Sequence, residues 1–147
     1  VKESLYFNVK LNLKGLYKNG YRFFFFFMLL DTLINQRKFP VLDSGTMYIQ
    51  ESQSANLIKE ALGIGFTLFN YEYKWVKGKT GKDREREQSE NIAKIMAQNP
   101  NAKFLIHCGY DHLNEGIPGI KEWEKAMAAR VHDLTGINPF TIDQIQG

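Results

Sequence analysis

Cysteine is nearly absent from this sequence, which contains Cys108 alone among its 147 residues. A single cysteine cannot form a disulfide within the chain, and it cannot build a zinc site from several thiolates. It does not identify the redox compartment, because reduced and oxidising environments both tolerate one free thiol. At the end of a buried strand, such a thiol is more often a packing group than a nucleophile.

Long apolar runs are also lacking. The longest uncharged apolar block, from Phe23 to Leu30, contains five consecutive phenylalanines but is far shorter than the roughly 20 residues of a membrane-spanning helix. We therefore expect no transmembrane helix.

The chain opens with VKESLYFNVK, which has no initiating methionine and no basic region followed by an apolar one. We expect an incomplete N-terminus, with any signal peptide absent or already removed.

The charge has little excess of either sign. Nineteen basic and sixteen acidic residues give a formal charge of +3, and the basic residues are scattered along the chain. They form no stripe along which a phosphate backbone would lie, so we expect no nucleic-acid partner.

The chain also lacks a glycine-rich phosphate loop, a GxSxG turn and an HExxH motif. Their absence excludes the commonest nucleotide-binding, serine-hydrolase and zinc-protease sites.

The remaining composition is that of one globular domain over residues 1–147, with 44% hydrophobic and 24% charged residues. Helical spacing of apolar residues predicts helices over 5–16, 52–63, 80–100 and 119–136. Apolar blocks predict strands at 21–30, 66–73 and 103–109, with a short one at 139–146. This alternation predicts an α/β fold with a mainly parallel sheet, crossover helices on its faces and its first strand missing.

Ligands of such sheets bind beyond the carboxyl ends of the strands, so the residues after each apolar block are candidates for a site. The segment HCGYDH, residues 107–112, is the most polar of these strand ends. Its two histidines and one carboxylate are suited to ligating a divalent metal, or one histidine to acting as a general base. The alternative is that His107 is a satisfied histidine at a strand end and that Asp111 and His112 only decorate a loop.

A second strand end carries Glu72 between Tyr71 and Tyr73, and these side chains are expected either to join the same cleft or to lie at the surface. The segment DREREQ that follows reads as the start of a helix. Asp83 and Glu85 there complement the helix dipole, while Arg84 or Arg86 pairs outward.

These strand ends, together with the segment DRER…NIAKIM…NPNAKFLIHCGYDH, resemble the erythromycin esterase and ChaN-like proteins, relatives of the TraB/Tiki group. The resemblance extends from about residue 63 to 144 and more loosely over 1–62. It implies an α/β sheet and a site containing an early glutamate followed by a histidine, a glutamate at the end of the next strand, an arginine and a late histidine. By position, Glu3, Arg84 and His112 are similar to the early glutamate, the arginine and the late histidine.

Two positions depart from that family pattern. Leu5 or Tyr6 stands where the resemblance implies a histidine after Glu3, and Phe27 stands where it implies the strand-ending glutamate. Phenylalanine cannot accept a proton or bind a metal. The resemblance therefore implies either a degenerate member that keeps the fold or a sequence that is incomplete in its first thirty residues.

Three functions follow from the resemblance. The first is a hydrolase of an ester-type small molecule, in which His112 activates water with the help of Glu72 or Glu3. The second is a non-enzymatic protein that binds haem or a divalent metal; the ligands would come from His107, His112, Tyr71, Tyr73, Tyr110 and Asp111. The third is a degenerate binding or structural domain, whose strand-end cleft binds a partner or nothing. The resemblance suggests a bacterial periplasmic or secreted protein, with a cytoplasmic one left open, as is the oligomeric state.

Overall fold

The computed structural model describes residues 33–45, 51–74 and 76–142, together with the backbone of 22–26. Three strands lie in these ranges: β1 (Arg22–Phe26), β2 (Thr67–Asn70) and β3 (Lys103–His107). The α-helices are α1 (Ile34–Arg37), α3 (Ser52–Gly63), α4 (Gly81–Gln98) and α5 (Met127–Thr135). Short 3₁₀ turns are η2 (Leu42–Ser44), η3 (Tyr110–Leu113) and η4 (Lys121–Trp123). Glu3, Phe27 and the helix predicted over 5–16 lie outside the described residues.

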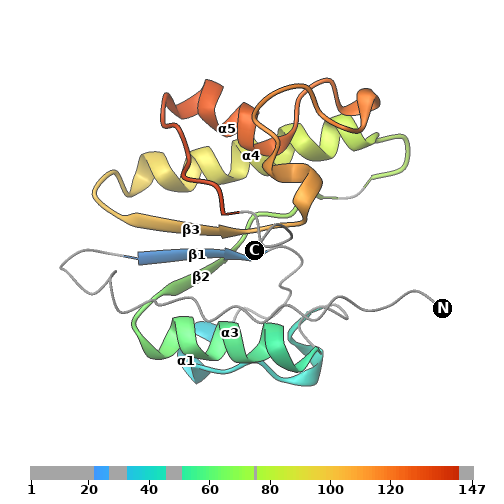
Figure 1. Ribbon diagram of the computed structural model, residues 1–147. Helices are drawn as coiled ribbons and strands as arrows, with labels where there is room; N and C mark the ends of the chain where they lie inside the picture. The colour runs from blue at the N-terminus through green and yellow to red at the C-terminus, as the bar shows by residue number, and fades with distance from the viewer. Residues whose placement is uncertain (1–21, 27–32, 46–50, 75, 143–147) are drawn as a thin grey trace.

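The three strands form a small parallel sheet in the order β2-β1-β3. Phe23 of β1 pairs with Thr67 of β2 on one side and with Phe104 of β3 on the other. The chain passes from β2 through α4 to β3, so β1 lies between two strands that are consecutive along the chain (Figure 1). Because all three strands run the same way, the residues after β2 and β3 emerge at one edge of the sheet.

Helices lie on both sides of this sheet, with α1 and α3 on one side and α4 and α5 on the other (Figure 1). Two apolar clusters fill the layers between helices and strands. Ile34, Ile58 and Leu68 belong to the first cluster, on the α1 and α3 side. Tyr71, Ile92 and Met127 belong to the second, on the α4 and α5 side. The second cluster anchors the elements that carry the candidate site.

The prediction of an α/β fold with a mainly parallel sheet is wrong. Among the described residues about 51% are helical, and the described strands contain five, four and five residues. The strand predicted over 66–73 ends at Asn70, whose side-chain Oδ1 accepts a hydrogen bond from Glu72 N at 2.9 Å and so turns the chain away from the sheet. In addition, residues 139–142 form no strand, and the helix predicted over 119–136 divides into η4 and α5. The described part of the chain is therefore about half helical, around a small sheet.

The edge strand β2 is covered by a side chain. Asn35 of α1 accepts a hydrogen bond from Leu68 N at 2.7 Å and donates one to Leu68 O at 2.9 Å. The Asn35 side chain thus makes, at Leu68, the two backbone hydrogen bonds that a neighbouring strand would make at this edge of the sheet.

Replacing Asn35 with alanine is expected to lower the free energy of unfolding by about 2 kcal/mol, because both backbone groups of Leu68 lose their partner. Chemical denaturation measures the change. Asn56→Ala, at an exposed position of α3, is the matched control and should change stability by less than about 0.5 kcal/mol. Equal effects of the two substitutions would show that the contact with Leu68 is unimportant.

Within the ranges that the structure describes, none of the helices combines the length and the apolar character needed to cross a membrane.

Candidate functional site

The first turns of α4 carry the central residues of the site. Thr80 caps this helix: its side chain accepts a hydrogen bond from Asp83 N, and the Asp83 carboxylate accepts one from Thr80 N. This reciprocal capping fixes where the helix begins. Arg84, Glu85 and Gln88 follow within two turns, and α4 presents them toward β2, η3 and α5.

Glu72, just after β2, is held from α4 by two side chains. Arg84 donates from Nε to Glu72 Oε1 at 3.1 Å and from Nη2 to Glu72 Oε2 at 2.9 Å, the paired geometry that guanidinium and carboxylate favour. Gln88 Nε2 donates to Glu72 Oε1 at 2.8 Å. Arg84 and Gln88 reach the same carboxylate because residues four apart lie on one face of a helix.

The charge state of this pair follows from its partners. Burial raises the pKa of the Glu72 carboxyl, but the hydrogen bonds from Arg84, Tyr73 N and Gln88 outweigh burial, so the pKa lies below its usual 4.5. Burial likewise lowers the pKa of Arg84, and Glu72 more than reverses this. A lowered carboxyl pKa adds stability above pH 4.5, and this stability is lost as the pH falls through the lowered pKa. Both groups are therefore charged near neutral pH.

His112 of η3 lies between two charged residues of α4. Its Nδ1 is 2.7 Å from Glu85 Oε1, and its Nε2 is 3.4 Å from Arg84 Nη1. The first distance is short enough for a charge-assisted contact, but neither Glu85 Oε1 nor His112 Nδ1 makes a hydrogen bond of regular geometry. An ionised carboxylate only accepts hydrogen bonds, so Glu85 favours the tautomer with the proton on Nδ1, and Nε2 then accepts the hydrogen bond from Arg84 Nη1, because a guanidinium only donates.

Glu85 itself is completely buried. Its second oxygen, Oε2, accepts a hydrogen bond from Met127 N at 2.8 Å, at the start of α5. The residue that precedes α5 is Ala126, whose side chain cannot cap a helix. Glu85 therefore caps α5 from α4 with one oxygen and holds His112 with the other, so the site and the packing of the two helices depend on the same carboxylate.

Trp123 of η4 covers the histidine. The two rings stack with centroids 5.0 Å apart and an angle of 14° between their planes. A Cβ added at Gly81, the first residue of α4, would lie 2.6 Å from Trp123 Nε1, closer than side chains pack. The indole thus lies between the start of α4 and the imidazole, and position 81 accommodates it only as glycine.

Tyr71 and His107 support the same edge of the sheet from its interior. The Tyr71 hydroxyl donates to His107 O at 2.8 Å, which ties the end of β2 to the end of β3. Burial raises the pKa of Tyr71 well above its usual value and lowers the pKa of His107 below 6.5. Both side chains are therefore neutral at pH 7, as expected of groups that support a site from the core.

Cys108 is a buried thiol beside the site. Burial, followed by the negative charge of Glu85, raises the pKa of the thiol from 9.0 to about 12. Because the thiolate is the reactive form, alkylation by iodoacetamide near about pH 8 should be about a thousandfold slower in the folded protein than in urea. Mass spectrometry of timed samples measures this ratio. Similar rates in both states would show that the thiol is open to solvent.

The other residues predicted for the site lie apart from the Glu85–His112 contact. Tyr73 packs outward, with the Lys79 ammonium 5.7 Å from its ring centroid. Tyr110 and Asp111 are exposed. Among the described residues, no group of three or more His, Cys, Asp or Glu side chains has the arrangement of a metal site. The predicted metal pair of His107 and His112 thus has no described third acidic, histidine or cysteine ligand.

Sequence reasoning found Glu72, Arg84 and His112, which the structure brings into contact, but it missed three of their partners. Glu85 was interpreted as a solvated residue that complements the helix dipole, whereas it is buried. Gln88 was detectable from its spacing of four residues from Arg84. Trp123 was predicted to belong to a continuous last helix, and no local pattern indicates that it stacks on His112.

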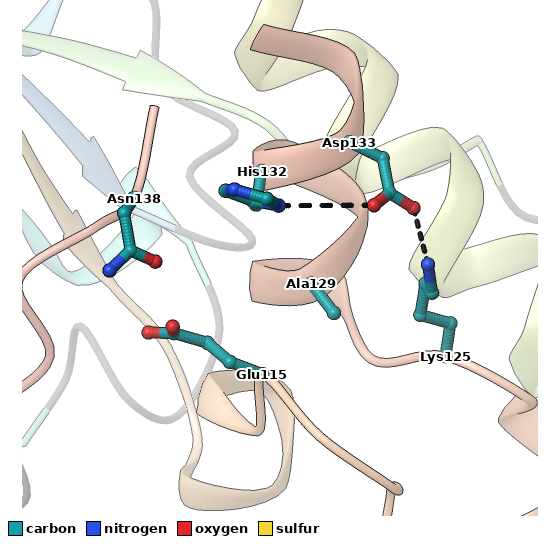
Figure 2. A pocket seen from close by; sticks show the side chains of 6 residues that line it. All are labelled: Glu115, Lys125, Ala129, His132, Asp133 and Asn138. Atoms are coloured by element: carbon teal, nitrogen blue, oxygen red, sulfur yellow. Dashed lines mark hydrogen bonds and ion pairs between the residues drawn. The ribbon is translucent and has the colours of Figure 1, made fainter. Parts of the chain in front are cut away.

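A separate surface pocket of about 190 Å³ lies beside α5 (Figure 2). Its lining consists of Glu115, Lys125, Ala129, His132, Asp133 and Asn138. Lys125 donates to Asp133 and Thr141 donates to Glu115, so these charged groups already have partners within the protein. The pocket includes none of the residues around His112 and is smaller than the roughly 300 Å³ at which small-molecule sites usually begin. It is not the candidate site.

No protein-family model, curated protein or solved structure matches this chain. The assignment of the site therefore depends on the geometry of its residues.

Proposed function

We propose that the protein hydrolyses an ester-type small molecule, with His112 as general base. The observation that carries this proposal is the 2.7 Å contact between Glu85 Oε1 and His112 Nδ1. A buried carboxylate behind one imidazole nitrogen, with the long 3.4 Å contact from Arg84 Nη1 at the other nitrogen, places His112 where general-base catalysis requires a proton acceptor once a substrate draws Arg84 away. Glu85 takes the supporting role that the sequence had suggested for Glu72 or Glu3.

In the proposed reaction, Arg84 Nη1 turns from Nε2 of His112 to the ester carbonyl oxygen. Nε2 then removes a proton from water as the water oxygen bonds to the ester carbonyl carbon. The carbonyl oxygen becomes negatively charged in the resulting tetrahedral intermediate. Arg84 supplies a permanent positive charge beside Nε2, and its Nη1 is not used by Glu72. The intermediate then breaks its bond to the leaving alcohol, which receives the proton from His112, and the carboxylic acid product remains.

Access to the site is from the side of Arg84. The Arg84 side chain is 27% exposed, whereas those of Glu72 and His112 are 12% exposed. A substrate therefore meets the guanidinium first and reaches Nε2 beside it. The ion pair with Glu72 keeps the Arg84 guanidinium in place. Its positive charge is therefore already in position before the substrate arrives.

The direct test is turnover of p-nitrophenyl esters of increasing acyl length by the purified wild-type protein. We expect saturable hydrolysis that exceeds the rate with the heat-denatured protein. A rate that increases linearly with ester concentration over the whole panel and is the same for folded and denatured protein would refute the proposed function.

A further inference from the structure

We propose that Trp123 is a positioning residue that holds the imidazole of His112 in its working orientation, and that Gly81 is required because it leaves room for the indole. This inference deepens the proposed function and rests on it for the catalytic consequence. The orientation of the histidine itself can be measured without any activity.

The contacts from α4 leave the imidazole ring of His112 incompletely fixed. Glu85 and Arg84 touch the two nitrogens of His112, but Glu85 Oε1 and Nδ1 form no regular hydrogen bond, and the contact with Arg84 is 3.4 Å long. Contacts at the nitrogens alone permit the ring to tilt about the line that joins them. The indole face stacked at 14° opposes this tilt.

Several hydrogen bonds and an ion pair hold the backbone around Trp123 in place. Arg130 of α5 donates to Trp123 O at 2.9 Å and to Lys125 O at 2.8 Å. Glu124, the next residue, has φ 59°, which is costly for a residue with a side chain, and its carboxylate pairs with Lys82 of α4. The turn after η4 therefore keeps an unfavourable backbone conformation, and the bonds on either side compensate for it.

Steric contact with α4 also fixes the position of the indole. The indole edge meets the start of α4 so closely that an added Cβ at Gly81 would lie 2.6 Å from Nε1 and 2.9 Å from Cδ1. Alanine at this helical position would otherwise be the better helix former. Gly81→Ala should therefore push the indole away from His112 while leaving the tryptophan present.

The test uses long-range ¹H–¹⁵N NMR spectra of the three histidine rings in the full-length protein. In the wild type we expect His112 as a single tautomer with its proton on Nδ1. In Trp123→Ala and Gly81→Ala, the chemical shifts of the two His112 ring nitrogens should move toward an average of the two tautomers. Trp123→Phe should keep most of the wild-type pattern because it retains a stacked ring. His112→Asn identifies which signal belongs to His112.

Two substitutions serve as matched controls. Phe140→Ala removes an aromatic ring that is 91% exposed, and Gly63→Ala adds a Cβ that meets nothing within 4 Å. Both should leave the His112 signals unchanged. If the His112 nitrogen shifts in both Trp123→Ala and Gly81→Ala equalled those of the wild type, the inference would be overturned. Two variants are used so that the misfolding of one cannot by itself produce the expected change in the His112 shifts.

The kinetic arm separates this inference from the proposed function. If the wild type hydrolyses esters, Trp123→Ala should lower kcat about tenfold with KM changed by less than about twofold, and Trp123→Phe should restore most of kcat. An unchanged kcat in Trp123→Ala would overturn the positioning role in catalysis. If the wild type hydrolyses no ester, the proposed function fails, and the NMR spectra alone decide whether Trp123 orients His112.

Discussion

Replacing Glu85 with alanine is expected to lower the free energy of unfolding by about 3 kcal/mol. Glu85 is fully buried and serves two elements at once, through Met127 N at 2.8 Å and His112 Nδ1 at 2.7 Å. Its loss leaves the first amide of α5 without an acceptor, and a hydrogen bond to a charged group accounts for about 1.5–3 kcal/mol. It also removes the contact behind His112. Urea denaturation followed by circular dichroism measures the change.

Two further variants make this prediction specific. Glu90→Ala removes a carboxylate from the exposed side of the same helix, where it lies 3.7 Å from Arg86, and should cost less than about 0.5 kcal/mol. Glu85→Gln keeps the shape and an acceptor for Met127 N, so it should recover most of the stability. If Glu85→Ala and Glu90→Ala destabilised the protein equally, Glu85 would not join α4 to α5 in the way described.

The helices were the most predictable part of the fold because their ends are coded locally. The helix expected over 52–63 is α3 with those bounds, and α4 begins just after Thr80, as its pattern indicates. The last helix ends before Gly136, whose φ of 69° suits glycine. Caps and stops act within one turn of the chain, so a single sequence contains the information needed to find them.

The extent of the sheet was not predictable in the same way. An apolar block shows that a segment is buried, but pairing with another strand decides how many of its residues form a ladder. The hydrogen bond from Glu72 N to the Asn70 side chain ends β2, which is four residues long. The break between η4 and α5 likewise depends on bonds from Arg130 to the turn, which no local pattern encodes.

The candidate site was partly predictable for a related reason. Residues that follow parallel strands emerge together, so a shared cleft was one of two alternatives for Glu72, the other being the surface, and the structure joins Glu72 to His112 through Arg84. The partner behind the histidine was not predictable, because Glu85 looks like any other acidic residue of a helix start. Only the packing of α5 onto α4 makes it a buried carboxylate.

Replacing His112 with asparagine is expected to lower kcat for ester hydrolysis at least about a hundredfold, with KM changed little. Asparagine keeps a polar side chain at the position but cannot accept the proton of the attacking water. Stopped or continuous assays with p-nitrophenyl esters measure both constants. A variant that keeps the wild-type kcat would show that His112 is not the base.

Comparison with other variants distinguishes the base from a group that only maintains the fold. His132→Asn, on the exposed face of α5, should leave kcat unchanged. Glu85→Gln should fall between the wild type and His112→Asn, because its amide no longer selects the Nδ1 proton while His112 itself remains. If Glu85→Gln and the wild type had the same kcat while His112→Asn was inactive, His112 would act without the buried carboxylate. That order of activities would require a different source for the orientation of the base, and the stacked ring of Trp123 would then be the main support of His112.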